Sequence, residues 1–164
     1  MRLTLILLLL ITTMTSIAQF GKPFKNRTLR WDYYHSGSVE AEYVVPDEMI
    51  LEGKWAGPKN NLIDPFDYGA FKIALYDSVS GELIYTRQFS SLFIEYQATE
   101  QAKSECGNFP ESIRMPLPKK TAKIEYYSRG ADMVWVMRYE GFINPRKDQV
   151  NIKPENQYPV EFIV

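Results

Sequence analysis

Apolar and polar residues alternate over short runs along most of this chain, which is the pattern of half-buried β-strands. The first clear run covers residues 28–35, where one face carries Leu29, Trp31, Tyr33 and His35. The same alternation predicts strands over residues 39–45, 70–77, 82–89, 111–117, 121–128, 133–142 and 150–153. Pro46 follows the second run, and we expect it to end that strand because proline cannot donate to a ladder.

Two pairs of these runs predict β-hairpins, since a short turn-forming segment separates the partners. Residues 70–77 and 82–89 are joined by Ser-Val-Ser-Gly, and their apolar faces can meet across the ladder through Phe71, Ile73, Leu75, Leu83, Tyr85 and Phe89. Residues 121–128 and 133–142 surround Arg-Gly-Ala-Asp. Both pairs indicate antiparallel sheet.

The stretch of residues 89–103 changes character part-way along. Alternation continues over residues 92–96, which predicts that the stretch begins as a strand. Thr99 is then a candidate N-cap, and Glu100 suits the first turn of a helix. We therefore expect one short helix near residues 99–105, bridging one sheet to another.

Seven to eight short strands with frequent turn signals and one short helix predict an all-β fold. We expect an antiparallel β-sandwich of jelly-roll-like kind, in one domain. The domain is placed at residues 28–153, after a polar lead-in at residues 19–27. Residues 154–164 are expected to be a tail or a truncated linker, because the chain stops within the hydrophobic run VEFIV.

The first eighteen residues predict a signal peptide rather than part of the fold. Arg2 supplies a basic start, residues 3–11 are apolar, and Ser16-Ile17-Ala18 offers the small residues of a cleavage site. The apolar run is shorter than the about 20 residues that span a bilayer, so no membrane span is expected after cleavage. We expect an exported bacterial protein, periplasmic or extracellular.

Charge and cysteine content exclude several classes of protein. The net charge is −1 and no basic block occurs, which argues against nucleic-acid binding. Cys106 is the single cysteine, so no internal disulfide can form, as is ordinary for an exported protein of a Gram-negative bacterium. With no histidine near it in sequence, Cys106 is interpreted as a structural residue rather than a nucleophile.

No motif for catalysis or metal binding is present in the sequence. His35 is the single histidine, so the H-E-x-x-H zinc motif is absent, and no G-x-S-x-G elbow occurs. On an apolar strand face, His35 is interpreted as a packed, hydrogen-bonded residue. Asp64 and Asp67 could approach a cation, but capping of their own loop is favoured. No cofactor or metal is expected.

Residues 47–68 carry little periodicity and are too long for an ordinary connection. The segment is rich in aromatic and apolar side chains, which favours a loop packed by its own residues. We expect Trp55 and Leu62 to pack inward, and Phe66 and Tyr68 to be shared with a partner. Burial of all four is the competing interpretation. The candidate recognition residues in this loop are Trp55, Asn61, Leu62, Asp64, Phe66 and Tyr68.

Three segments carry a resemblance to a known family: WAGPKNNLIDPFDYGAFKIALYD, SGELIYTRQFSSLFIEYQATEQAK and FPESIRMPLPKK. They are similar to the N-terminal domain of the bacterial IgA-peptidase-type zinc metallopeptidases, secreted enzymes of Bacteroides-like bacteria. The resemblance covers roughly residues 28–143. Its specific pieces include Trp55 with Gly57-Pro58, Asp64-Pro65-Phe66, and Tyr68-Gly69.

The resemblance implies a β-sandwich that precedes a separate catalytic domain carrying H-E-x-x-H. That domain is absent from this sequence, so no zinc ligand or catalytic glutamate carries over, and no enzymatic activity is expected. The leading hypothesis is a non-catalytic accessory domain, as a fragment or a stand-alone form, whose partner is a metallopeptidase catalytic domain. The alternative is an independent module that binds glycan or a host glycoprotein through the aromatics of residues 55–68.

Overall fold

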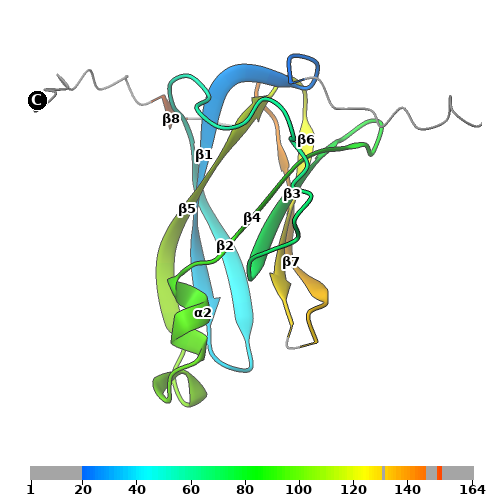
Figure 1. Cartoon of the computed structure of the whole chain (residues 1–164). Helices are drawn as coiled ribbons and strands as arrows, with labels where there is room; N and C mark the ends of the chain where they lie inside the picture. Colours follow the sequence, from blue (N-terminus) through cyan, green and yellow to red (C-terminus); the bar gives the residue numbers. More distant parts are fainter. Residues whose placement is uncertain (1–19, 131, 147–150, 153–164) are drawn as a thin grey trace, which may run out of the picture.

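The structure is a computed structural model that describes residues 20–130, 132–146 and 151–152. Within these residues the chain forms two four-stranded sheets that face one another, as a β-sandwich (Figure 1). The strands are β1 (Phe24–Gly37), β2 (Glu42–Leu51), β3 (Phe71–Asp77), β4 (Leu83–Phe89), β5 (Gly107–Pro118), β6 (Ala122–Arg129), β7 (Trp135–Ile143) and β8 (Asn151–Ile152). Two helical segments, α2 (Leu92–Gln97) and the 3₁₀ turn η2 (Gln101–Lys103), connect β4 to β5.

The first sheet has the order β5-β1-β2-β8 and the second has the order β4-β3-β6-β7. Sequential strands pair as the antiparallel hairpins β1–β2, β3–β4 and β6–β7, while β5 crosses back to pair with β1. The pairing of β2 with β8 is parallel. The predicted all-β sandwich and its two later hairpins are therefore confirmed.

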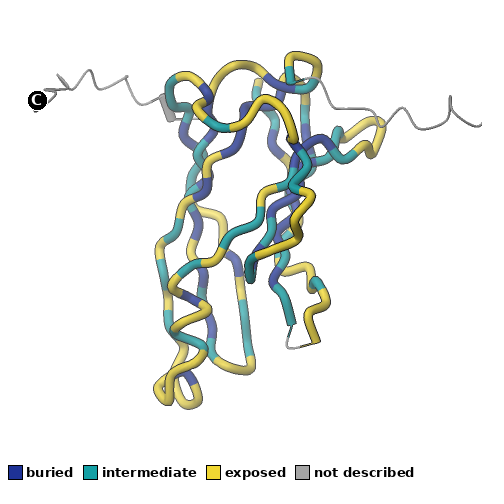
Figure 2. Tube along the Cα trace, in the orientation of Figure 1, coloured by how far each residue is buried: buried dark blue, intermediate teal, exposed yellow. Residues whose placement is uncertain are grey.

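The core lies between the inner faces of the two sheets, where Figure 2 shows the buried positions. On β1 the predicted face is correct, since Leu29, Trp31, Tyr33 and His35 are all buried. The strand begins at Phe24, four residues before the predicted start, and Phe24 is itself buried. Part of the expected lead-in thus belongs to the sandwich.

The prediction that Pro46 ends the second strand is wrong. β2 continues through Pro46 to Leu51, and Pro46 lies opposite Tyr33 at a register shift in the β1–β2 ladder. The proline is tolerated because this part of β2 is an edge: in the described part of the chain, β8 pairs with β2 only at Ile50 and Leu51. The aperiodic loop, which was predicted to begin at residue 47, therefore begins only after Leu51.

The prediction of a strand over residues 92–96 is also wrong, because α2 occupies this stretch. Ser91 is its N-cap and accepts a hydrogen bond from the Phe93 amide, and Phe93 is the buried residue of the helix. The region near residues 99–105 forms only η2, where Thr99 Oγ1 accepts from the Ala102 amide at 3.3 Å. Burial of Phe93 between the sheets favours the helix over the strand that the alternation predicted.

The loop after β2 follows the outer edge of β4 on its way to β3. The Thr86 amide donates to the carbonyl of Leu62 at 2.9 Å, and the Asp64 amide donates to Thr86 Oγ1 at 2.7 Å. These bonds attach the loop to the second sheet. In the described part of the chain, no helix is long and apolar enough to span a membrane.

Candidate functional site

The polar centre of the sandwich is His35 on β1, whose side chain is fully buried at 0% exposure. Its Nε2 lies 2.9 Å from Oε1 of Glu42 on β2, and its Nδ1 lies 3.4 Å from Oε2 of Glu111 on β5. The ring stacks on Phe93 of α2 with 3.8 Å between centroids. The expectation of a packed, hydrogen-bonded histidine is confirmed.

The same polar cluster joins the two sheets. Glu42 Oε2 accepts a hydrogen bond from Ser128 Oγ on β6 at 2.8 Å and lies 3.1 Å from Nε of Arg138 on β7. On the other side, the Tyr33 hydroxyl donates to Glu111 Oε2 at 2.8 Å. Because buried carboxylates are costly without partners, this shared set of donors is what allows two of them inside the sandwich.

The cluster shifts two pKa values in opposite directions. Burial lowers the pKa of His35, but the neighbouring carboxylates of Glu111 and Glu42 raise it by more, so the net shift is upward. Burial raises the pKa of Glu111, but hydrogen bonds with His35, Ser91 and Tyr33 outweigh it, so the net shift is downward. Both shifts favour the charged pair of imidazolium and carboxylate.

A groove of about 710 Å³ opens at the end of the sandwich beside this cluster. We call it the open-end groove. It lies where β1, β4 and β6 end and where β2, β3 and β7 begin. Glu42 and Arg138 of the buried cluster line it, and so does Gln97 at the end of α2. The groove therefore leads from the surface to the polar centre of the fold.

The rim of the open-end groove is apolar and comes from four separate segments. They are the β1–β2 turn, the loop before β3, helix α2 and the β6–β7 turn, and they contribute Val39, Tyr68, Ile94 and Met133. All four side chains are exposed. Met133 has a φ of +65°, which is uncommon for a residue with a side chain. An exposed apolar rim around a polar floor is typical of a recognition site.

The loop before β3 is held in part by hydrogen bonds and an ion pair of its own aspartates. Asp64 Oδ1 accepts a hydrogen bond from the Phe66 amide at 3.0 Å, which is the capping role favoured from sequence. Asp67 accepts from Trp135 Nε1 at 3.1 Å and pairs with Arg129 at 3.1 Å. Across the described residues, no group of three His, Cys, Asp or Glu side chains could hold a metal ion.

Trp55 and its neighbours form a compact unit at the start of this loop. The Trp55 side chain is buried, and its Nε1 donates to the carbonyl of Pro58 at 2.9 Å. Gly57 lies under the indole, where a Cβ atom would be only 2.2 Å from the ring. The W-A-G-P segment is therefore explained by packing, since only glycine leaves room for the indole.

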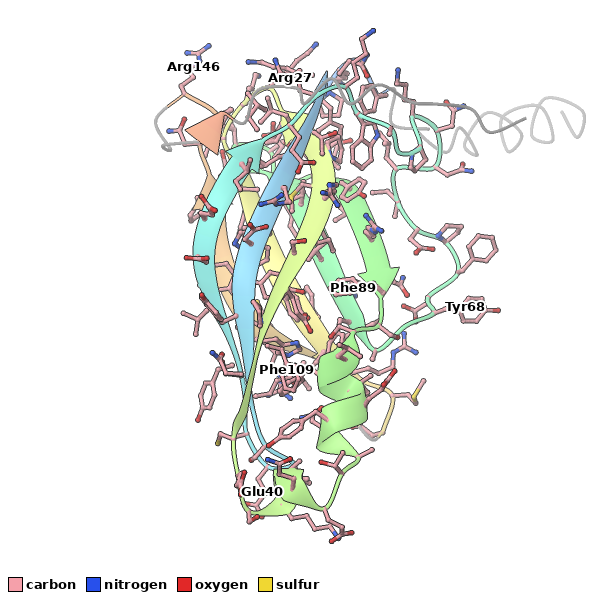
Figure 3. The ribbon with its side chains drawn as sticks, turned by 90° about the vertical axis from the view of Figure 1, so that its left-hand side faces the viewer. Arg27, Glu40, Tyr68, Phe89, Phe109 and Arg146 are labelled. Carbon is pink, nitrogen blue, oxygen red and sulfur yellow. The ribbon has the colours of Figure 1, made fainter. Side chains whose placement is uncertain are left out.

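The structure separates the candidate recognition residues into two groups. Trp55 and Leu62 are buried in the core, whereas Phe66 and Tyr68 are 70% and 76% exposed. The two exposed rings are parallel within 8°, with 6.2 Å between centroids. Tyr68 points away from the sheets (Figure 3), while Asn61 is an exposed residue with a φ of +54°. Their role in recognition stays a prediction.

Sequence reasoning missed the buried carboxylates and the arginine of the cluster. Glu111 did carry a signal, because it falls in phase with the inward residues Ile113 and Met115 of β5. Glu42 is likewise in phase with the buried Val44 of β2. Arg138 gave no comparable signal, and its contact with Glu42 depends on how the sheets stack. Cys106 is free and exposed just before β5.

Residues 19–140 match the family model of the Peptidase M64 N-terminus. The chain belongs to this family. No protein with a curated description matches it. The match covers β1 to β6, most of β7, and every segment of the open-end groove, so the site described above lies within the M64 N-terminal domain.

Proposed function

We propose that this chain is a non-catalytic accessory domain of a secreted, IgA-peptidase-type metallopeptidase, made as a fragment or as a stand-alone form. The observation that carries the proposal is the match to the Peptidase M64 N-terminus over residues 19–140. The lack of an H-E-x-x-H motif supports a non-catalytic role, as does the complete burial of His35. The domain acts by binding rather than by chemistry.

The open-end groove and the exposed loop beside it form the docking surface in this proposal. Phe66 and Tyr68 present two aromatic rings to solvent, and Tyr68 lines the groove together with the apolar rim residues Ile94 and Met133. Aromatic residues and methionine are enriched at protein–protein interfaces, and interface anchors lie within a polar surround. The partner is the peptidase region of an M64 polypeptide.

The proposed location is outside the cytoplasm of a bacterium, in the periplasm or beyond the cell. The basic start, apolar run and Ser16-Ile17-Ala18 of the sequence support export through a cleaved leader. A domain that serves a secreted peptidase needs the same route as its partner.

A second candidate function is an independent exported module that binds glycan or a host glycoprotein. The observation in its favour is the parallel, exposed pair of Phe66 and Tyr68, because flat aromatic surfaces can stack on the apolar faces of sugar rings. In this case the chain binds carbohydrate without any peptidase region present.

The experiment uses the chain and a separately produced peptidase region of an M64 enzyme, with binding measured by titration calorimetry. We expect binding, and we expect Phe66→Ala with Tyr68→Ala to weaken it by about tenfold or more, as loss of interface anchors does. Val79→Ala is the matched control, since Val79 is 90% exposed in the β3–β4 turn at the opposite end of β3.

Absence of binding by the unaltered chain would refute the accessory role. Binding of a neutral oligosaccharide that the double variant abolishes would favour the second candidate. The genomic sequence downstream also bears on the proposal, because an H-E-x-x-H segment there would indicate a fragment.

A further inference from the structure

The exposed rings of Phe66 and Tyr68 are separated by a residue that is bound to the second sheet. That residue is Asp67, whose Oδ1 accepts a hydrogen bond from Trp135 Nε1 at 3.1 Å. Its Oδ2 lies 3.1 Å from Nη2 of Arg129, and the same nitrogen donates to the Asp67 carbonyl at 2.9 Å. We call Asp67, Arg129 and Trp135 the Asp67 clamp. It joins the loop before β3 to the last residue of β6 and the first residue of β7.

The two partners of Asp67 are themselves held in place. The Arg129 guanidinium stacks on the Trp135 ring, with 4.2 Å between Cζ and the ring centroid, and Lys72 Nζ lies 4.4 Å from the same centroid. An ion pair between mobile surface side chains contributes little, because ordering both side chains costs conformational entropy. Here the stack orders Arg129 and Trp135 independently of Asp67, so the clamp avoids much of that cost.

The clamp lies between two other attachments of the loop. On one side the Asp64 amide donates to Thr86 Oγ1 of β4, and on the other the Arg129 amide donates to the Ala70 carbonyl at 2.8 Å. Within the described part of the chain, residues 65–69 form hydrogen bonds to the sheets through Asp67 alone. Without the clamp, the segment that carries both rings would be hydrogen-bonded to the sheets only at its ends.

The backbone around the clamp has one defined, uncommon conformation. Asp67 has a φ of +52°, a left-handed conformation that aspartate and asparagine tolerate better than most residues. Gly69 has a φ of +101°, and a Cβ atom there would lie 2.8 Å from the Phe89 carbonyl oxygen. With the backbone fixed in this way, the flanking rings of Phe66 and Tyr68 lie parallel within 8°.

The opposite side of the open-end groove is cross-linked in a similar way. Gln97 Nε2 at the end of α2 donates to the carbonyl of Ser38 at 3.0 Å, and the Val39 amide donates to the carbonyl of Ala102 at 3.0 Å. The β1–β2 turn is therefore bound to the helical segment, as the loop before β3 is bound to the β6–β7 hairpin. A binding site whose parts are already ordered loses less entropy when its partner binds.

We propose that Asp67 is a positioning residue, which holds Phe66 and Tyr68 in their binding orientation through its contacts with Arg129 and Trp135. This inference rests on the proposed function and specifies how the docking surface is formed before the partner binds. Asp67 acts through the two rings rather than by contact with the partner. Its loss weakens binding because the loop must then become ordered during association.

The first test measures order in the chain alone. Asp67→Asn with Trp135→Phe removes the ion pair and the indole N–H, while asparagine tolerates a positive φ and phenylalanine keeps a ring beside Arg129. By NMR relaxation, we expect amide order parameters over residues 66–69 of about 0.85 in the unaltered chain and below about 0.6 in the variant.

Lys103→Gln is the control for the loss of an ion pair, since it removes the exposed pair with Glu100 in η2. It should leave the order of residues 66–69 unchanged. Melting temperatures show whether each variant is folded. If the double variant does not fold, Asp67→Asn alone repeats the measurement, because that side chain is 61% exposed.

The second test measures affinity for a separately produced M64 peptidase region by titration calorimetry. The clamp variant should bind about tenfold more weakly than the unaltered chain. In a chain that already carries Phe66→Ala and Tyr68→Ala, the same clamp substitutions should cause no further loss, because the clamp acts through those rings. A purely structural role would not confine the loss of affinity to the chain that retains both rings.

Loss of loop order together with a loss of affinity that depends on the two rings supports the inference. An ordered loop in the clamp variant, a mobile loop in the unaltered chain, or loss of order without loss of affinity overturns it. A further loss of affinity in the chain without the rings also overturns it, since Asp67 would then contact the partner itself. In each of these cases binding by the unaltered chain leaves the accessory role standing, whereas absence of that binding overturns both.

Discussion

His35 Nε2, on β1, lies 2.9 Å from Glu42 Oε1 on the adjacent strand β2, and the imidazole of this pair is fully buried. Through Glu42, this imidazole is linked to Ser128 and Arg138 of the opposite sheet. The stability of the whole sandwich is therefore coupled to the protonation of one histidine.

This coupling predicts a defined pH dependence. The pKa of His35 is raised above its ordinary 6.5, so its contribution is complete below pH 6.5 and is lost as pH rises through the folded-state pKa. The pKa of Glu111 is lowered from 4.5, so its contribution is present above pH 4.5 and is lost as pH falls through its folded-state pKa. Denaturant unfolding should give a maximal free energy between these values.

His35→Gln removes the titrating group and should abolish the loss of stability on the alkaline side. It should also lower the free energy of unfolding by about 1–3 kcal/mol near pH 5.5, because buried polar partners lose hydrogen bonds. Glu40→Gln, in the exposed β1–β2 turn, is the control and should keep the full profile. An unchanged alkaline slope in His35→Gln would contradict the assignment.

Truncating a side chain in the loop after β2 should affect the stability of the fold very differently at the two ends of this loop. Trp55→Ala should cost about 3–5 kcal/mol of unfolding free energy, as large core truncations do. Phe66→Ala should change it by no more than about 0.5 kcal/mol, because its side chain is 70% exposed. If chemical denaturation showed the same loss of unfolding free energy in both variants, Phe66 would be part of the core.

Gly57 should be intolerant of even one added methyl group. Gly57→Ala places a Cβ atom against the Trp55 indole and should destabilise the fold by about 1–3 kcal/mol, the usual cost of overpacking. Gly21→Ala is the matched control, because no atom lies within 4 Å of its Cβ position. Thermal melts of the two variants provide the comparison, and similar melting temperatures would contradict the packing argument.

Removal of metal should leave the fold intact. The described residues contain no group of ligands for an ion, and the loop aspartates are engaged by Phe66, Trp135 and Arg129. A chelator should therefore leave the melting temperature unchanged, and the purified chain should hydrolyse no peptide. A large decrease in the melting temperature with chelator, reversed by zinc or calcium, would show that Asp64 or Asp67 binds a cation.

Export should remove the first eighteen residues. Mass spectrometry of the protein recovered outside the cytoplasm should give a chain beginning at Gln19, as the small residues before it predict. Replacing Ala18 by a bulky residue should block cleavage, whereas the same change at Gly21 should not. A secreted chain that still begins at Met1 would contradict the prediction.

The alternation of apolar and polar residues determined the sheet content and much of the core. On β1, Leu29, Trp31 and Tyr33 could be placed on one inward face because strand periodicity is local and strict. The β3–β4 and β6–β7 hairpins were predictable for the same reason, as their turns lie next to the strands that they join. The last short strand, at β8, was also predicted.

Tertiary packing decided the elements whose local signals were ambiguous. Residues 92–96 alternate as a strand would, but α2 forms because Ser91 caps it and Phe93 fills a space beside His35. Pro46 could remain inside β2 only because that part of the strand is an edge. Neither the stacking partner of Phe93 nor the position of an edge is encoded within a few residues of the segment itself.

The candidate site shows the same division. From sequence, the loop of residues 55–68 was recognisable as a packed, aromatic segment, since its composition is a local property. The open-end groove was not, because Val39, Tyr68, Ile94 and Met133 come from four segments that meet only when the sheets stack. The Glu42–Arg138 contact arises in the same way. Side-chain periodicity determines which residues face inward, whereas the order and stacking of strands determine which of them meet.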